Sequence, residues 1–211
     1  MQKSRALTRF LIACLCMLGA AWPALATEGS KWDYIEEDDG IHTWKKELDG
    51  DMPAFRGQTH IKGTLDDVLK PVMDWKRHTE WMYLCRESTL LKELSPTRAL
   101  MYNRIRGVWP VWDRDVIADT ALSWAADRKS LAITFNSVES NLRPVPDRVV
   151  RMPKMHGALK MWQVEPNKVK VVYEVEADIG GRIPKWLAKL GARDLPYHTL
   201  YKLRARVEGT E

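Results

Sequence analysis

The stretch from Val169 to Leu187 reads VKVVYEVEADIGGRIPKWL and decides the fold. Apolar and polar residues alternate from Val169 to Ala177, which predicts a half-buried strand. Gly180-Gly181 ends this strand, and Pro184 then stands where the first turn of a helix tolerates proline. A strand that leads into a closing helix, in a chain otherwise rich in strand patterns, indicates an α+β protein.

The sequence before this stretch predicts a long antiparallel sheet with two short helices inserted early. Thr64 is a suitable N-cap for the first helix, which we expect Pro71 to end or kink, and the second helix covers Asp74–Met82. Short polar turns separate the strands, which favours hairpins. The predicted strands are Trp32–Glu36, Ile41–Leu48, Ala54–Lys62, Cys85–Leu94, Arg98–Arg106, Asp113–Trp124, Leu131–Val138, Val149–Met155, Ala158–Val164 and Val169–Ala177.

The closing helix presents one apolar face, and most strands present an apolar face as well. In the strand Asp113–Trp124, alternation places Arg114 on the apolar side and leaves Asp113 and Asp115 as paired surface acids on the other. An apolar helix over an apolar sheet face makes either a packed core or a lined cavity, and packed cores are commoner. The helix residues that form its apolar face are Ile183, Trp186, Leu187 and Leu190.

The loop Gly107-Val108-Trp109-Pro110-Val111-Trp112 is unusual because it carries two tryptophans and two valines. Loops normally run over the protein surface, where large apolar side chains are exposed to water. Two interpretations stay open. The aromatic side chains fold back onto the core, or they form an apolar gate, a ligand wall or a tip that touches a membrane.

The first 26 residues predict a secretory signal peptide. Three basic residues precede an apolar run over residues 10–22, and Ala24-Leu25-Ala26 supplies an A-x-A cleavage site. The apolar run has about 13 residues, fewer than the roughly 20 that span a bilayer. A membrane anchor, or a lipoprotein site at Cys14, is the alternative. We expect cleavage after Ala26, export to the periplasm and one domain over residues 27–211.

The charge and the cysteines change meaning once this segment is removed. The 211-residue chain carries 33 Lys+Arg and 28 Asp+Glu, and loss of the three basic signal residues lowers its net charge from +5 to +2. Cys85 alone remains, so no intramolecular disulfide can form. The remaining basic residues are interleaved with acidic ones, and a nucleic-acid partner requires a continuous basic surface. We therefore expect no nucleic-acid partner.

Motifs for catalysis, cofactors and metals are not found in the sequence. The five histidines lack H-x-H or H-E-x-x-H spacing, and we expect each to lie at the surface or in a turn. No G-x-S-x-G elbow, phosphate loop or dinucleotide fingerprint occurs. Cys85 is expected to be a small buried apolar residue rather than a nucleophile. The predicted catalytic, metal and cofactor sets are therefore all empty.

Two segments together resemble a known family. Trp109-Pro110-Val111-Trp112-Asp113-Arg114-Asp115 and the segment Asp178–Leu187 resemble the START domains (steroidogenic acute regulatory protein-related lipid transfer) of exported bacterial proteins. Val149-Val150-Arg151-Met152 and Phe55-Arg56-Gly57 follow the expected order. The resemblance extends from about Trp32 to Val207.

The resemblance implies a helix-grip fold, in which a curved antiparallel sheet wraps around the C-terminal helix and encloses a lipid-sized cavity. The loop Gly107–Trp112 would then be the gate beside that helix. Some eukaryotic members hold the polar end of the ligand with an acid and an arginine, and this chain departs from that pattern. Its candidate polar anchors are Asn103, Arg114, Thr120 and Tyr173. The full expected ligand-binding set is Met101, Asn103, Trp109, Val111, Trp112, Arg114, Thr120, Phe135, Tyr173, Ile183, Trp186, Leu187 and Leu190.

These features predict a monomeric periplasmic protein that binds a lipid or another hydrophobic small molecule, with transient contact to a membrane surface. Binding alone would be favourable because burial of each methylene contributes about 0.8 kcal/mol. Two alternatives stay open. One is a cyclase- or hydrolase-like enzyme working in the same cavity, and the other is a module that binds or senses a lipid without transferring it.

Overall fold

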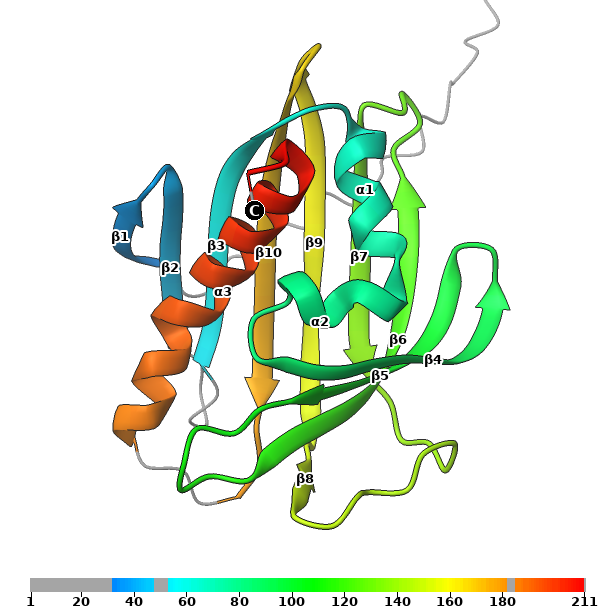
Figure 1. Ribbon diagram of the computed structural model, residues 1–211, viewed down its shortest axis with the longest axis vertical. Coiled ribbons are helices and arrows are strands. Elements are labelled where there is room, and N and C mark those ends of the chain that lie inside the picture. The colour runs from blue at the N-terminus through cyan, green and yellow to red at the C-terminus, as the bar shows by residue number, and fades with distance from the viewer. Residues whose placement is uncertain (1–31, 48–52, 182–184, 211) are drawn as a thin grey trace, which may run out of the picture.

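The computed structural model describes residues 32–47, 53–181 and 185–210, with no side-chain detail for Glu47, Pro53 and residues 185–193. Three helical segments follow the first three strands, and one long helix ends the fold (Figure 1). The elements in chain order are β1 (Asp33–Asp38), β2 (Ile41–Glu47), β3 (Pro53–Lys62), α1 (Leu65–Met73), the 3₁₀ turn η1 (Trp75–Arg77), α2 (His78–Trp81), β4 (Cys85–Ser95), β5 (Arg98–Ile105), β6 (Asp113–Trp124), β7 (Ser130–Ser137), β8 (Val149–Arg151), β9 (Lys154–Glu165), β10 (Lys168–Asp178) and α3 (Lys185–Glu208).

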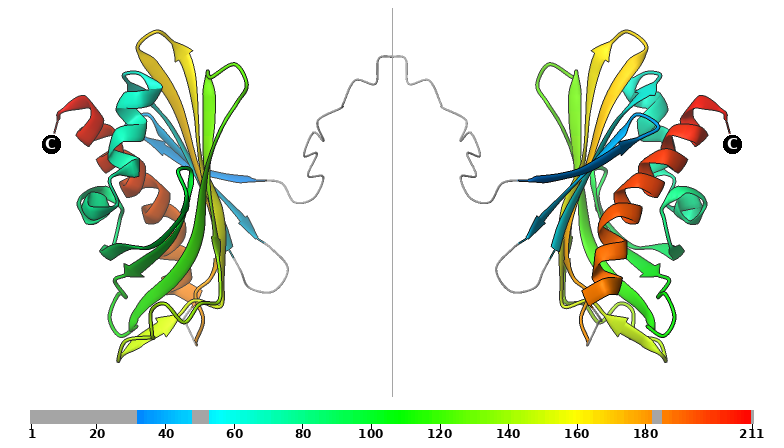
Figure 2. Two further views of the ribbon diagram at one scale, coloured as in Figure 1. Left: turned by 90° about the vertical axis from the view of Figure 1, so that its right-hand side faces the viewer. Right: turned by 90° about the vertical axis from the view of Figure 1, so that its left-hand side faces the viewer.

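The strands form one curved sheet in the order β1-β2-β3-β10-β9-β7-β6-β5-β4. The last strand, β10, pairs with β3 on one side and β9 on the other, both antiparallel. The chain crosses the sheet once, through α1, η1 and α2, from β3 to the edge strand β4. All described helices lie on the same, concave side (Figure 2). The α+β helix-grip architecture predicted from the sequence is confirmed.

Two local predictions are wrong. The predicted strands Val149–Met155 and Ala158–Val164 are instead a three-residue β8, parallel to the start of β6, and a long β9 that begins at Lys154. Pro153 separates β8 from β9, because proline has no N–H to donate to a ladder. Helix α1 also continues past Pro71 to Met73. Its start is as expected, since Thr64 and Asp67 form a reciprocal capping box.

The core lies between the concave face and the helices. On β10, the alternation from Val169 to Val175 points its odd-numbered side chains toward α3, while Glu174 on the opposite face pairs with Arg56 and Lys160. Leu200 and Leu203 of α3 are fully buried against this concave face. Burial of these side chains, at about 25 cal/mol per Å² of apolar surface, holds the helix to the sheet.

Gly57 on β3 is the point of closest approach between sheet and helix. A Cβ atom built there would lie 2.8 Å from Leu200 Cδ1 and 2.9 Å from Pro196 Cβ. Any side chain at this position would push α3 away from the sheet. The absence of a side chain at Gly57 therefore sets how closely the helix covers the concave face.

Substitution of Gly57→Val is expected to lower the free energy of unfolding by about 1–3 kcal/mol, because an overpacked contact forces α3 or β3 to move. Gln58→Val is the matched control, since it adds a β-branched side chain to the same strand on the opposite face. Urea denaturation of both variants measures the difference. Equal stability of the two variants would contradict the packing role of Gly57.

Candidate ligand-binding site

Two chain segments meet at one end of the sheet, next to Arg114. They are the tryptophan loop, residues 107–112, and the link after β10 at residues 179–181. Arg114 donates three hydrogen bonds to backbone carbonyls: Nη1 to Trp112 at 2.6 Å, Nε to Ile179 at 3.2 Å and Nη2 to Gly180 at 3.1 Å. Arg114 is buried, and burial lowers the pKa of its guanidinium. One side chain thus ties the tryptophan loop to the link that leads into α3.

The two aspartates beside Arg114 stabilise the base of the tryptophan loop from the other face of β6. Asp113 accepts hydrogen bonds from Arg86 and Arg104 and, at 3.0 Å, from the backbone N–H of Gly107. Burial alone would raise the pKa of Asp113, but these donors hold it below its ordinary value. The expectation that Asp113 and Asp115 are surface acids is wrong, because both side chains are buried.

Asp115 lies on the same face of β6 and is fully buried. Its carboxylate accepts two hydrogen bonds from Arg151 of β8, at 2.7 and 3.0 Å. A buried carboxylate requires such a partner because an unpaired charge is costly to remove from water. Sequence alternation identified the face correctly, but it could not show a partner 36 positions along the chain.

The tip of the tryptophan loop faces water. Trp109 is 87% exposed and Trp112 is 58% exposed, while Val108 is exposed as well. Val111 is half-buried and its N–H donates to the carbonyl of Val108 at 2.9 Å, which closes a tight turn. Neither tryptophan folds back onto the core. The loop therefore has a hydrogen-bonded base and an exposed apolar tip.

The remaining described candidates line the concave face of the sheet. Met101 is buried on β5, and Thr120 stands on β6 directly opposite Phe135 of β7. The Phe135 ring lies over Gly157 of β9 and 6.2 Å from the ring of Tyr173. Pairing thus brings side chains from four strands together beneath the helices.

Asn103 is a polar residue on this otherwise apolar face. It pairs across the strands with Ser88, whose hydroxyl lies 3.3 Å from Nδ1 of His78 in the helical layer. The opposite ring nitrogen of His78 lies 2.8 Å from the Val72 carbonyl. Asn103 Oδ1 is buried, and no described group donates a hydrogen bond to it. An unpaired buried acceptor costs free energy, so this oxygen is a position where a bound molecule can donate.

The prediction that every histidine lies at the surface or in a turn is wrong for His78. It is buried between Trp75 and Trp81, with ring centroids 5.6 and 5.2 Å away. The spacing of these two tryptophans, three residues before and after His78, is the signal that could have placed the ring in the apolar face. Burial lowers the pKa of His78.

Cys85 and Tyr173 are buried as well. Burial raises the pKa of the Cys85 thiol to about 11, so the thiol is protonated near neutral pH. Burial also raises the pKa of the Tyr173 hydroxyl, and the nearby Cys85 adds to that shift. Both groups are therefore neutral, and Cys85 has the inert character expected from the sequence.

A small hollow opens onto the concave face between η1 and the β4–β5 hairpin. It has a volume of about 110 Å³ and reaches Thr120, Leu122 and Ile133 beneath the helices. Sites for drug-sized ligands measure about 300–1,000 Å³. This hollow alone is therefore smaller than such a site.

The expected helix residues of the site cannot be placed. Ile183 lies outside the described residues, and Trp186, Leu187 and Leu190 belong to the part of α3 without described side chains.

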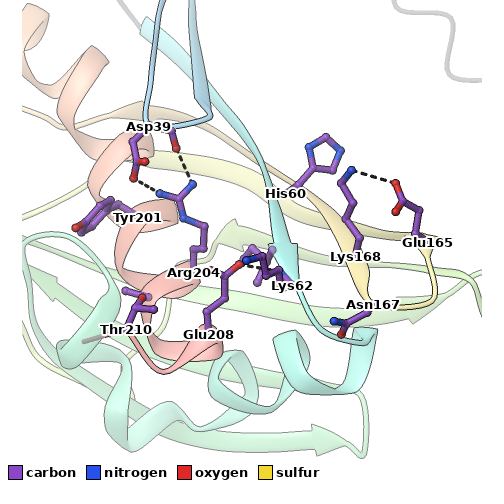
Figure 3. A pocket seen from close by; sticks show the side chains of 12 residues that line it. Asp39, His60, Lys62, Glu165, Asn167, Lys168, Tyr201, Arg204, Glu208 and Thr210 are labelled. Carbon is purple, nitrogen blue, oxygen red and sulfur yellow. Dashed lines mark hydrogen bonds and ion pairs between the residues drawn. The ribbon is translucent and has the colours of Figure 1, made fainter.

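A larger hollow, about 690 Å³, lies at the other end of α3 (Figure 3). Its charged groups are largely paired with one another: Arg204 with Asp39, and Lys168 with Glu165 at 3.0 Å. Glu208 accepts a hydrogen bond from the backbone N–H of Lys62. This groove is polar and open, so it does not suit a hydrophobic ligand.

Comparison with known families agrees with this arrangement. The family model described as the START domain matches residues 24–193. The chain belongs to the START-domain family. An uncharacterized protein of Pseudomonas aeruginosa is 30% identical over 205 residues, which cover 97% of this chain and 98% of that protein.

Comparison with solved structures also finds the START fold. A STAR-related lipid transfer protein from Xanthomonas axonopodis is 28% identical, covers 84% of this chain and 98% of its own, and superposes with a TM-score of 0.75. Human StAR-related lipid transfer protein 5 is 16% identical over 85% of this chain and 87% of its own, with a TM-score of 0.77. A Streptomyces aromatase/cyclase shares the fold alone, at 9% identity over 74% of this chain and 94% of its own and a TM-score of 0.54.

The described part of this START chain shows neither a metal-binding cluster nor a membrane-spanning helix. Residues 32–47, 53–181 and 185–210 contain no group of three or more His, Cys, Asp or Glu side chains placed to hold a metal ion. Within the same ranges, no helix is both long and apolar enough to cross a membrane.

Removal of the Arg114 side chain is expected to loosen the end of this START domain. Arg114→Met leaves three carbonyls without their donor and should lower the free energy of unfolding by about 2–4 kcal/mol. Arg114→Lys should recover only part of this, because an ammonium lacks the planar fork of a guanidinium. Arg106→Met, an exposed arginine at the same end, is the control. Chemical denaturation that finds Arg114→Met as stable as Arg106→Met would contradict the bridging role.

His78 should make the stability of the START domain fall in acid. Its folded-state pKa lies below the ordinary value, so the unfolded chain binds the proton more readily as the pH falls through about 6.5. The unfolding free energy of the wild type should therefore drop between pH 7.5 and 5 relative to that of His78→Gln. Ser88→Ala keeps the buried ring and should keep the wild-type slope. Parallel slopes for wild type and His78→Gln would contradict this assignment.

Proposed function

We propose that this protein binds one lipid or other hydrophobic small molecule between the concave face of the sheet and the helices, in the periplasm after removal of residues 1–26. The observation that carries the proposal is an apolar sheet face beneath the helices, together with an exposed apolar loop that Arg114 ties to the link into α3. The STAR-related lipid transfer protein from Xanthomonas supports it, as a similar chain named for lipid transfer.

The energetics require both apolar burial and a polar anchor. Complete burial of a sixteen-carbon chain contributes about 12 kcal/mol at roughly 0.8 kcal/mol per methylene. Loss of translational and rotational freedom costs about 4–15 kcal/mol. The apolar term is therefore of the same size as this cost, and one well-placed hydrogen bond changes the affinity about tenfold.

Asn103 is the anchor we infer for the polar end of the ligand. Its buried Oδ1 has no donor among the described residues, whereas Arg114 already donates to three carbonyls. The Tyr173 hydroxyl and the buried Cys85 thiol are neutral. Among the residues whose side chains are described, the interior thus offers an acceptor but no unpaired cation. This chemistry fits a neutral head that donates a hydrogen bond, such as a hydroxyl group.

A binding series with ligands of equal length tests the proposal. Hexadecanol, hexadecanoate and hexadecane would each displace a fluorescent lipid analogue, and we expect hexadecanol to bind most tightly. Asn103→Leu should weaken hexadecanol about tenfold and leave hexadecane unchanged, because only the alcohol donates a hydrogen bond. Asn136→Leu, an exposed asparagine on the opposite face of β7, is the control.

Two results would count against this proposal. If none of the three ligands binds, the binding function fails. If hexadecanol binds equally well to wild type and Asn103→Leu, the anchor is elsewhere.

An enzyme acting in the same interior is the second candidate, because Ser88 and His78 form a serine–histidine pair with a separation of 3.3 Å. A hydrolase of this kind would cleave a bound long-chain ester and lose that activity in Ser88→Ala. A binding protein would return the ester unchanged. Mass spectrometry of the ester after incubation distinguishes the two.

The loop tip suggests how the ligand is exchanged. Trp109 and Trp112 present exposed aromatic surface next to the link into α3, and aromatic side chains favour the interface between water and a membrane. We include transient contact of this tip with a membrane, and transfer of the ligand there, in the proposed function.

A further inference from the structure

A second loop at the same end of the molecule also exposes apolar side chains. The β7–β8 loop, residues 138–148, presents Leu142 and Val145, which are 52% and 49% exposed. Large apolar side chains on a loop cost little when scattered singly, but several at one end of a protein indicate a contact surface.

Both loops lead into the same end of the sheet. Val149, which follows the β7–β8 loop, pairs in parallel with Asp113, which follows the tryptophan loop. The link after β10 lies against β8 and Pro153, because a Cβ at Gly180 would lie 3.0 Å from Pro153 and 3.3 Å from Val150. In both views of the fold the two loops and the link form the same lower end (Figures 1 and 2).

The β7–β8 loop is braced against the sheet. Arg143 lies over the Tyr102 ring at 4.7 Å and pairs with Glu87 at 2.8 Å. The backbone carbonyl of Arg143 accepts a hydrogen bond from Arg151, which also pairs with Asp115. These contacts fix the backbone at Arg143, and Leu142 and Val145, which lie before and after it in the chain, are exposed.

The charges around this end favour an anionic partner. Residues 138–154 contain four basic and two acidic residues. The Arg148 side chain is 81% exposed and lies 4.0 Å from the carboxylate of Asp147, whose side chain is 97% exposed. Lys154 and Arg106 are exposed as well. Exposed apolar side chains with nearby cations are the combination that binds a membrane carrying anionic headgroups.

We propose that the β7–β8 loop is a second membrane-binding element, which docks on an anionic lipid bilayer through Leu142, Val145 and Arg148, together with Lys154 at the start of β9. With the tryptophan loop it makes a two-point contact that holds this end of the fold against the membrane. The proposal rests on the proposed lipid-binding function and adds the partner surface and the orientation. The partner is the bilayer itself, since the apolar side chains suit its hydrocarbon region and the cationic side chains suit its anionic headgroups.

Vesicle binding tests the proposal with matched variants. Co-sedimentation would use mixed phosphatidylcholine–phosphatidylglycerol vesicles and pure phosphatidylcholine vesicles. Leu142→Ser/Val145→Ser should weaken binding to the mixed vesicles by roughly tenfold, because two apolar side chains lose their burial. Arg148→Glu/Lys154→Glu should remove the preference for the anionic vesicles and the salt dependence of binding. Leu94→Ser/Val164→Ser is the matched control, a leucine and a valine of similar exposure far from this end.

Hexadecanol binding in solution, measured on the same variants, separates this proposal from the proposed function. We expect all three double variants to bind hexadecanol as the wild type does. If Leu142→Ser/Val145→Ser sediments with mixed vesicles as the wild type does, or if the wild type binds no vesicles, the docking proposal is overturned while ligand binding stands. If hexadecanol binding is absent from the wild type, the proposed function fails independently of the vesicle result.

Discussion

The contact between α3 and β3 at Gly57 is the constraint on which the rest of the structure depends. A ten-stranded sheet with one apolar face must cover that face, and most of the covering comes from a single helix lying directly on the backbone of β3. The contact is made by Leu200, Pro196 and their neighbours through packing, which is strong in sum but non-directional. A helix held in this way can separate from the sheet without breaking a hydrogen-bond ladder. The same contact therefore provides both a stable core and a way to open it.

At the start of β6, charged groups on the two faces of the sheet have different partners. Asp113 and Asp115 are paired with arginines on the convex side, so the start of β6 is fixed. On the concave side Arg114 holds only backbone carbonyls, from the tryptophan loop and from the link into α3. Hydrogen bonds from a charged donor are worth roughly 1.5–3 kcal/mol each, so a few such contacts couple the two segments. The tip beyond them is left free and apolar.

Much of this arrangement can be predicted from local sequence. Alternation along Val169–Ala177 and the Gly180-Gly181 break predict the last strand and its end. The sequence marks the loop with two tryptophans as unusual but leaves open whether these side chains fold back or are exposed. The inward direction of Arg114 also follows from alternation. Each of these features depends on residues that are neighbours in the chain, where periodicity and turn chemistry are informative.

The features that sequence reasoning missed depend on distant partners. Alternation cannot show that Val149 pairs in parallel with Asp113, or that Arg151 reaches Asp115, and so the two aspartates were expected at the surface. His78 was expected there too, because a single histidine does not reveal the aromatic pocket that folding builds around it. The free Oδ1 of Asn103 is a property of its surroundings rather than of its type. These contacts arise only once the strands have paired.

The central claim is that a hydrophobic ligand lies between the concave face and the helices. Photo-crosslinking tests it most directly, with a long-chain alcohol that carries a diazirine in its alkyl chain, followed by mass-spectrometric mapping of the labelled peptides. The account predicts labels on concave-face peptides that contain Met101, Phe135 or Tyr173, reduced by excess hexadecanol. Labels confined to the convex face, or to the polar groove around Tyr201 and Arg204, would contradict it.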